Sequence, residues 1–177
     1  MRKNLLENTA TSQTKSGVTI TVNEDGSAIF NGTATSTIFF TVNIITFIAD
    51  DSYIISGCPK SGSAQTFFVK IELDDDTSTF YTDMGKEVRI TPSITAKYRY
   101  TIRIASGYTC DNLTFYPMIR KATIEDDTYE PYFSDTELDI TLPAISTLAG
   151  TNTLTVGTEV QPSGVEIKGR IKAAGGD

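Results

Sequence analysis

Alternation between apolar and polar residues at every second position is the feature that most constrains how this chain can fold. The clearest run is residues 98–104, YRYTIRI, and similar runs occupy residues 18–22, 67–73 and 86–91. A period of two places one set of side chains on each face of a β-strand, whereas a helix repeats every 3.6 residues. Turns separate these runs at short intervals. We therefore predict an all-β protein, a jelly roll or β-sandwich of roughly eight to ten strands with no helix.

A β-hairpin is predicted near the start of the chain. Residues 18–22, VTITV, are followed by Asp25-Gly26, a strong hairpin turn signal, and then by a second run over residues 27–35. Gly32 lies inside that second run, where a glycine indicates a bulge or the close approach of two backbones.

Residues 37–48, TIFFTVNIITFI, form a longer and more apolar stretch. Ile38, Phe40 and Val42 share one face of a strand, and Phe39 lies on the other. Because both faces carry large apolar side chains, we predict a strand that is covered on both faces and is interrupted near Asn43.

The segment of residues 113–132 is predicted to close the domain. Its first half, LTFYPMIRK, has the pattern of a strand with a basic tip at Arg120 and Lys121. Its second half ends in residues 129–132, YEPY, where Pro131 holds Glu130 in an extended geometry. We predict that the two tyrosines lie across the sandwich edge with buried rings and hydrated hydroxyls; a ligand site there is the alternative.

The composition excludes several functions. The chain has no His, so catalysis by Ser-His-Asp or Cys-His groups and metal sites with His ligands are excluded. A net charge of −7 disfavours binding to nucleic acid or to an anionic membrane. Two cysteines, Cys58 and Cys110, are too few for a disulfide scaffold, and two buried thiols are favoured over one bridge. We expect synthesis in the cytoplasm, because no signal peptide or membrane span is visible.

The composition changes after Tyr132, where aromatic residues nearly vanish. We predict a sandwich domain over residues 1–134 and a C-terminal extension or assembly arm over residues 135–177. Three short alternating patches in the arm offer too little apolar surface for a core of their own, so they should dock on the sandwich or on a neighbouring subunit. Their apolar residues are Leu138, Ile140, Leu142, Leu154, Val156, Val165, Ile167 and Ile171.

Three motifs carry a resemblance to a known family: an NLL start at residues 4–6, a GVTITVNEDGS hairpin leading to NGTA, and an FYPMIR strand followed by YEPY. With them the chain resembles carbohydrate-binding-like jelly-roll modules of tail, baseplate and receptor-binding proteins in phages and prophages of Gram-positive bacteria. Residues 142–172 also resemble C-terminal extensions of such virion proteins. The resemblance implies a virion location.

The outward face of the sheet is the candidate binding surface, because guanidinium groups and aromatic rings together suit sugars or protein surfaces. The same stripe could instead pack against another sheet, a subunit or the arm. If strands adjacent in sequence pair, this glycan or partner surface collects Phe68, Arg89, Arg99, Arg103, Tyr116, Met118 and Arg120.

No cofactor and no catalytic residue is predicted. Asp74-Asp75-Asp76 and Asp126-Asp127 could supply oxygen ligands to a structural Ca²⁺, which modules of this fold often carry, but solvated turns are the default interpretation.

Two functions follow as expectations. The first is a non-enzymatic virion structural protein that assembles through its arm, by strand addition, with itself (a homo-oligomer, with a trimer as the guess) and with other virion proteins. The second is an adhesin that binds a glycan of the host surface weakly at each site and gains strength by multivalency.

Overall fold

The computed structural model describes residues 3–76 and 80–133 of the chain. These residues form β-strands and no helix, which confirms the all-β prediction. None of them belongs to a helix that could span a membrane. The arm of residues 135–177, with all its predicted docking residues, lies outside the described part. The strands are β1 (Gln13–Lys15), β2 (Val18–Val22), β3 (Ala28–Thr33), β4 (Ile38–Phe47), β5 (Tyr53–Ser56), β6 (Phe67–Leu73), β7 (Phe80–Asp83), β8 (Val88–Ile90), β9 (Ala96–Ile104), β10 (Thr109–Phe115) and β11 (Met118–Lys121).

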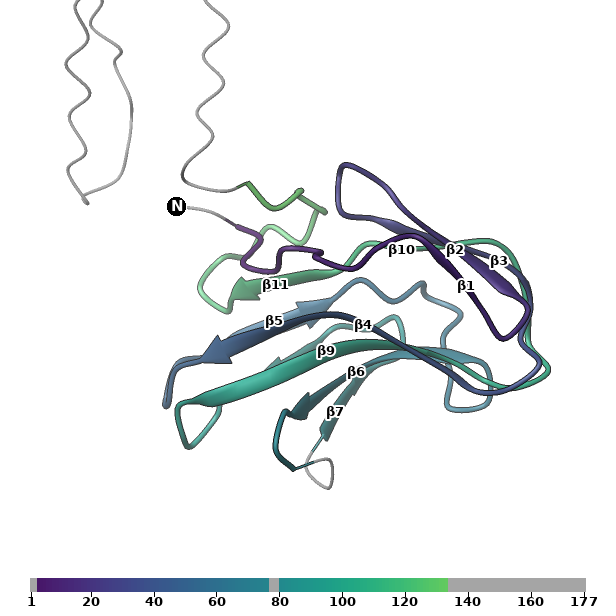
Figure 1. Cartoon of the computed structure of the whole chain (residues 1–177). Helices are drawn as coiled ribbons and strands as arrows, with labels where there is room; N and C mark the ends of the chain where they lie inside the picture. Colours follow the sequence, from purple (N-terminus) through teal and green to yellow (C-terminus); the bar gives the residue numbers. More distant parts are fainter. Residues whose placement is uncertain (1–2, 77–79, 134–177) are drawn as a thin grey trace, which may run out of the picture. The chain divides into compact units, whose positions relative to one another are not determined.

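The strands form three antiparallel sheets arranged in two layers. One layer contains the sheet β1-β2-β3-β10 and the sheet β11-β5-β8, and the other contains the sheet β4-β9-β6-β7 (Figure 1). The predicted hairpin is present as β2 and β3, which pair from Val18 with Gly32 to Val22 with Ala28. Gly32 has φ of +116°, and a Cβ at this position would lie 2.4 Å from the carbonyl oxygen of Gly17. The prediction of a close backbone approach is therefore confirmed.

The closing strand is divided in two at Tyr116 and Pro117. β10 pairs with β3, whereas β11 pairs with β5 in the adjacent sheet. Pro117 has no N–H to donate to a ladder, so the strand changes partners at this point. Tyr116 N donates to the Gly57 carbonyl at 3.0 Å across the junction. The predicted strand is thus real, but it links two sheets instead of completing one.

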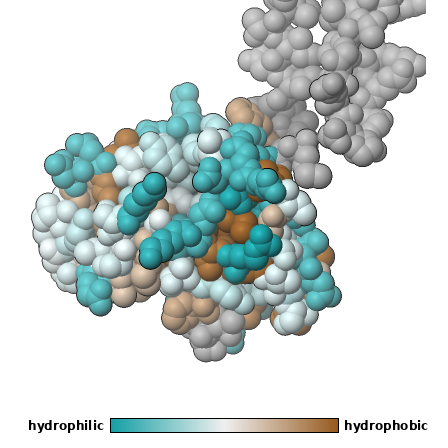
Figure 2. All heavy atoms as spheres, turned by 180° about the vertical axis from the view of Figure 1, so that it is seen from behind, coloured by the Kyte–Doolittle hydropathy of each residue, from teal (hydrophilic) through white to brown (hydrophobic). Residues whose placement is uncertain are grey.

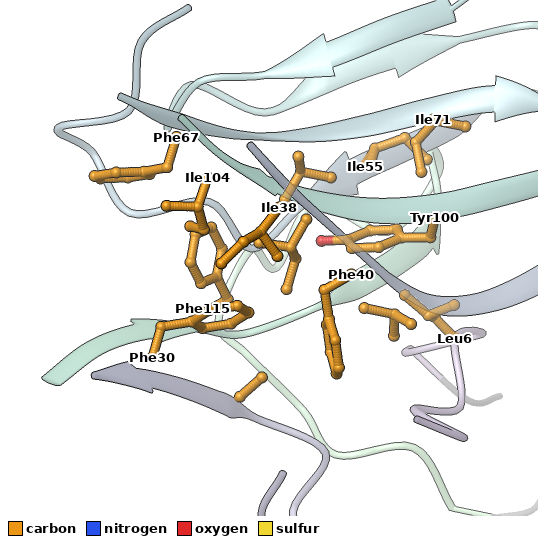
Figure 3. Packing of buried hydrophobic residues seen from close by; sticks show 14 of the residues in the cluster. Leu6, Phe30, Ile38, Phe40, Ile55, Phe67, Ile71, Tyr100, Ile104 and Phe115 are labelled. Atoms are coloured by element: carbon orange, nitrogen blue, oxygen red, sulfur yellow. The ribbon is translucent and has the colours of Figure 1, made fainter. Parts of the chain in front are cut away.

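Aromatic side chains from both layers meet in the core (Figure 3). The Phe30 ring of β3 packs edge-on against Phe40 of β4, with centroids 5.6 Å apart. Phe115 of β10 likewise meets Phe67 of β6 at 5.7 Å. Tyr100 of β9 is fully buried, and its hydroxyl donates to the Ser56 carbonyl at 2.8 Å. Burial of these large apolar surfaces is the main force that holds the two layers together.

β4 differs from its prediction in one respect. It carries the expected irregularity, a register shift between Thr41 and Asn43, but only one of its faces is covered. Phe40 is 2% exposed, whereas Phe39 is 49% exposed. The prediction of a strand covered on both faces is wrong because β4 is the edge strand of a two-layer sandwich, and no third layer of the described residues lies outside it.

The segments before β1 and after β11 fasten to each other at one end of the sandwich. Asn4 is 1% exposed, and its Oδ1 accepts from Leu6 N at 2.9 Å and Ile119 N at 3.2 Å. Its Nδ2 donates to the carbonyls of Pro117 at 3.2 Å and Glu130 at 3.0 Å. Lys3 Nζ adds contacts of 2.8 Å to Asp126 Oδ2 and to Thr128 Oγ1. We call residues 3–6 and 126–130 the buckle.

Tyr129 completes the buckle. Its ring packs on that of Tyr116, with centroids 5.1 Å apart, and its hydroxyl donates to the Asp25 carbonyl in the β2–β3 turn. Burial, together with the nearby Asp25 and Tyr116, raises the pKa of Tyr129 to about 12. The structural role expected for YEPY therefore fits this tyrosine, although its hydroxyl binds the protein and was predicted to bind water.

Candidate interaction face

The second layer presents a four-stranded surface that points away from the core. Alternation along β9 buries Tyr98, Tyr100, Ile102 and Ile104 and turns the residues between them outward. Strand register then fixes which outward side chains lie beside one another. We call this surface the outer face. Its rows are Phe39, Arg103 and Phe68; then Thr41, Thr101, Lys70 and Thr82; then Ile44, Arg99, Glu72 and Phe80; and finally Thr46 and Lys97.

Large apolar side chains are exposed on both borders of the outer face. Phe39 and Ile44 of β4 are 49% and 42% exposed, and Phe80 of β7 is 52% exposed. Figure 2, which views the molecule from behind, shows apolar patches set among hydrophilic residues. Exposed aromatic side chains gathered on one sheet face, next to charged groups, are typical of a surface that binds another molecule.

One carboxylate lies among the basic groups at the centre of the outer face. Glu72 is only 6% exposed, and it pairs with Lys70 at 2.5 Å and with Arg99 at 3.7 Å. Arg99 also pairs with Asp74 at the end of β6. A buried carboxylate requires such compensation, because removing a charge from water is costly. Lys70 and Arg99 are thus neutralised within the chain.

The other two basic groups of the outer face are not neutralised. Arg103 lies 5.1 Å from the ring centroid of Phe68 and donates to the Ala64 carbonyl at 2.9 Å, which is a neutral acceptor. Lys97 is exposed. Neither makes an ion pair with a carboxylate of the described residues. The outer face therefore carries an unpaired positive charge at each end of β9, although the net charge of the chain is −7.

Thr101 lies on β9 between these two ends. The residue is 2% exposed, and its Oγ1 has no hydrogen-bond partner among the described residues. A buried hydroxyl without a partner destabilises a fold by about 1–3 kcal/mol. The outer face therefore contains an unused polar group beneath its long side chains.

The exposed edge of β4 is occupied by other groups of the chain. Lys15 Nζ donates to the Phe39 carbonyl at 2.8 Å, and Thr9 N donates to the Val42 carbonyl at 3.3 Å. Asn43 Oδ1 accepts from Ile44 N at 2.7 Å. Such contacts, together with the bulge, hinder the pairing of another strand along this edge. The open surface is accordingly the face of the sheet.

The predicted binding residues do not lie together: three share the outer face and four lie elsewhere. Phe68, Arg99 and Arg103 do lie together on the outer face. Arg89 is on β8, in the other layer, and Tyr116 belongs to the junction beside Tyr129. Met118 and Arg120 of β11 are buried, and Arg120 pairs with Glu87 at 3.1 Å. The single predicted surface is wrong because β9 pairs with β4 and β6, and not with the strand that follows it.

Sequence reasoning missed the other members of the outer face, chiefly Phe39, Ile44, Lys70, Phe80 and Lys97. The alternation of β4 and β6 already placed Phe39 and Lys70 opposite the core residues. The missing information was strand order, which local patterns do not specify.

Two of the carboxylates that were candidates for binding Ca²⁺ make contacts within the fold. No three His, Cys, Asp or Glu side chains among them gather in a way that could hold a metal ion. Asp74 binds Arg99, and hydrogen bonds from Lys3 and Thr128 hold the pKa of Asp126 well below its usual range. These two carboxylates of the Ca²⁺ candidates thus have cationic side chains as partners.

Cys58 and Cys110 are free thiols. Burial and the nearby Asp83 raise the pKa of Cys58 to about 12, and burial raises the pKa of Cys110 to about 11. Asp83 itself accepts from the backbone N–H groups of Cys58, Gly85, Lys86 and Glu87 at 2.7–3.2 Å. Because a thiolate is the reactive form, both cysteines are suited to packing.

Comparisons with known proteins give structural likeness only. No family model and no curated protein matches the chain. One chain in a structure of accessory secretory proteins 1, 2 and 3 from Streptococcus pneumoniae matches with 17% sequence identity and a TM-score of 0.47. The match covers 68% of this chain and 96% of that chain. One chain in a structure of the glycosylation-associated protein complex Gap123 from Streptococcus agalactiae matches with 13% sequence identity and a TM-score of 0.50. The match covers 70% of this chain and 46% of that chain.

The match with a TM-score of 0.50 corrects the resemblance to phage modules, since that structure is a complex of glycosylation-associated proteins and not a virion protein. The predicted virion function and the homo-trimer are therefore wrong, and the glycan-binding alternative has no support. The quoted motifs misled for a physical reason. The NLL start and residues 129–130 of YEPY lie in the buckle, and GVTITVNEDGS forms part of a hairpin. They specify how a sandwich closes, which is a property of the fold and not of a function.

Proposed function

We propose that this chain is a non-enzymatic subunit of a multi-protein complex, and that its outer face is the surface on which another protein docks. The Streptococcus agalactiae structure, whose fold resembles that of this chain, is a complex of glycosylation-associated proteins. That likeness supports assembly with other proteins as the general role.

The observation that carries the proposal is the mixture of groups on the outer face. Phe39 is exposed there beside Arg103, and Ile44 and Phe80 are exposed at the two ends of the row that contains Arg99. Aromatic residues and Arg are enriched at protein interfaces, because each removes a large area from water and Arg also makes directed hydrogen bonds. An outer face of this composition is expected to bury these side chains against a partner.

A non-enzymatic role fits the chemistry of the described residues. Burial keeps the two thiols protonated, and the carboxylate oxygens of Asp83 accept hydrogen bonds from backbone N–H groups. The sequence also contains no His to act as a general base.

Co-purification from the source cells tests the proposal. The tagged full chain is compared with the variant Phe39→Ser/Ile44→Ser and with the control Ile48→Ser/Ile94→Ser, which also removes two exposed apolar side chains but at positions after β4 and before β9, beyond the four rows. We expect discrete proteins to accompany the wild type and the control, and to be lost with the Phe39→Ser/Ile44→Ser variant. The proposal fails if the wild type purifies alone or if both variants keep the same companions.

Amine-reactive cross-linking gives an independent measurement. Lys70 and Lys97 lie on the outer face, whereas Lys60 and Lys86 are exposed on the loops after β5 and β7. Docking on the outer face predicts cross-links to the companions from Lys97 and Lys70 in preference to Lys60 and Lys86. Cross-links that come mainly from the loop lysines would place the interface elsewhere.

A further inference from the structure

We infer that the docking partner presents an acidic segment that also carries apolar side chains, and that this segment lies along β9 with its carboxylates at Lys97 and Arg103. This inference rests on the proposed function, since it names the chemistry of the partner for the same face. It follows from the charge balance of the outer face, from the geometry of β9 and from the position of the exposed apolar residues.

The charge balance selects an acidic partner. Of the four basic side chains on the outer face, Lys70 and Arg99 are neutralised by Glu72 and Asp74. Lys97 and Arg103 have no carboxylate partner among the described residues. Two free cations close to exposed apolar groups favour carboxylates on an incoming surface and oppose a basic one.

Arg103 is already held in a receiving geometry. Its guanidinium lies over Phe68, and one N–H is used by the Ala64 carbonyl at 2.9 Å. A guanidinium has five N–H donors, so donors remain for a carboxylate while the group loses little freedom on binding. The cation at this end of β9 is therefore preorganised for an anion.

The positions along β9 suggest the length of the segment. Lys97 and Arg103 are six residues apart on one strand, which corresponds to about 20 Å. Thr101 lies between them, and its unpartnered Oγ1 is a further hydrogen-bonding group on the same side of the strand. Because this hydroxyl is buried, a partner reaches it only when neighbouring long side chains change rotamer. The segment is accordingly expected to be extended over several residues.

The exposed apolar residues of β4 indicate where the apolar side chains of the partner segment would lie. Phe39 pairs across the sheet with Arg103, and Ile44 pairs with Arg99, so an apolar border runs parallel to the cations. A segment lying along β9 places its carboxylates above β9 and its apolar side chains above β4. Nucleic acid and anionic lipid fit less well, because two free cations supply little of the phosphate neutralisation that such binding needs.

Fluorescence polarisation with synthetic peptides tests the inference directly. The probe is a fluorescein-labelled peptide of alternating Glu and Leu, compared with peptides in which Gln or Lys replaces Glu. The protein is the full chain, as wild type, as Lys97→Gln/Arg103→Gln, and as the control Lys60→Gln/Lys86→Gln, which removes the same charge from exposed loops. We expect the Glu-Leu peptide to bind best, and the Lys97→Gln/Arg103→Gln variant to bind it about tenfold more weakly than the control does.

Several results would overturn the inference. These are equal binding of the Gln-Leu peptide, tighter binding of the Lys-Leu peptide, and equal loss of affinity in the two charge variants. Tighter binding of a single-stranded oligonucleotide or of phosphatidylserine vesicles would also overturn it, by naming a different class of partner.

Co-purification separates this inference from the proposed function. If companions are lost with Phe39→Ser/Ile44→Ser but kept with Lys97→Gln/Arg103→Gln, docking on the outer face holds and the acidic partner is wrong. If both variants keep their companions, both the proposed function and the inference fail.

Discussion

The buckle and the outer face treat their polar groups in opposite ways. In the buckle, Asn4 is buried and makes four hydrogen bonds to the backbone. On the outer face, Thr101 is equally buried and its hydroxyl makes none. The half-buried Tyr129 of the buckle packs its ring on Tyr116, whereas Phe39 of the outer face is half exposed. The first region is completed by the chain itself, whereas the second is the surface on which we propose that another protein docks.

The largest expected effect is in the buckle. Asn4→Ala leaves two backbone N–H groups and two carbonyls without their partner, and we expect unfolding to become easier by about 3 kcal/mol. Asn8→Ala is the matched control, because Asn8 makes two backbone hydrogen bonds in a less buried position. It should lose about 1 kcal/mol or less. Urea unfolding measures both, and equal losses would contradict a special role for Asn4.

The buckle should also weaken in alkali. The pKa of Tyr129 is raised from the usual 10.0 to about 12, so the folded state favours the neutral phenol. The stability that this group contributes is complete below pH 10 and is lost as the pH rises from 10 to about 12. We expect the advantage of the wild type over Tyr129→Phe in free energy of unfolding to disappear across that window. An advantage that stays constant with pH would show that the phenol does not titrate in this way.

Removing a buried polar group should stabilise the protein on the outer face, whereas it should destabilise the protein in the buckle. Thr101→Val keeps the shape of the side chain and removes the unpartnered hydroxyl, so we expect unfolding to become harder by about 1 kcal/mol. Thr82→Val, on the same face at the edge strand β7, is the control and should change stability little. A destabilised Thr101→Val variant would mean that this hydroxyl has a partner.

The smallest expected effect is at the exposed border. Phe39→Ala should alter the free energy of unfolding by no more than about 0.5 kcal/mol, since the ring contributes little to the core. The neighbouring change Phe40→Ala should cost about 3–5 kcal/mol, because that ring is fully buried between the layers. Thermal unfolding of the two variants compares the faces of one strand. A large loss for Phe39→Ala would indicate that the ring supports the fold.

Alternation allowed the strands to be predicted, but not their neighbours. The patterns around Val18, Val69 and Ile102 identified strands and buried faces, because each depends on residues close in sequence. The pairing of β9 with β4 joins residues that are 49 to 66 positions apart, and no local pattern encodes it. The outer face could therefore be predicted in part, through Phe68 and Arg103, while Phe39 was assigned to a covered surface.

Only the C-terminal half of the buckle could be predicted from the sequence. Pro131 and the tyrosines indicated a structural closure at residues 129–132. Nothing near Asn4 in the sequence showed that its amide would meet Pro117 and Glu130, more than a hundred residues away. Contacts of this kind emerge only when the whole sandwich is assembled.

The distance between the two halves of the buckle has a consequence during synthesis. Asn4 leaves the ribosome long before Glu130, its partner 126 residues later, has been made. A chain grows at about 5–20 residues per second, so this early segment, with Leu6 exposed, waits for several seconds before it can be seated. The interval is one in which a chaperone could hold it, and in which crowded nascent chains could aggregate through it. Slowing translation late in the message would lengthen that interval, whereas slowing it within the first codons would not.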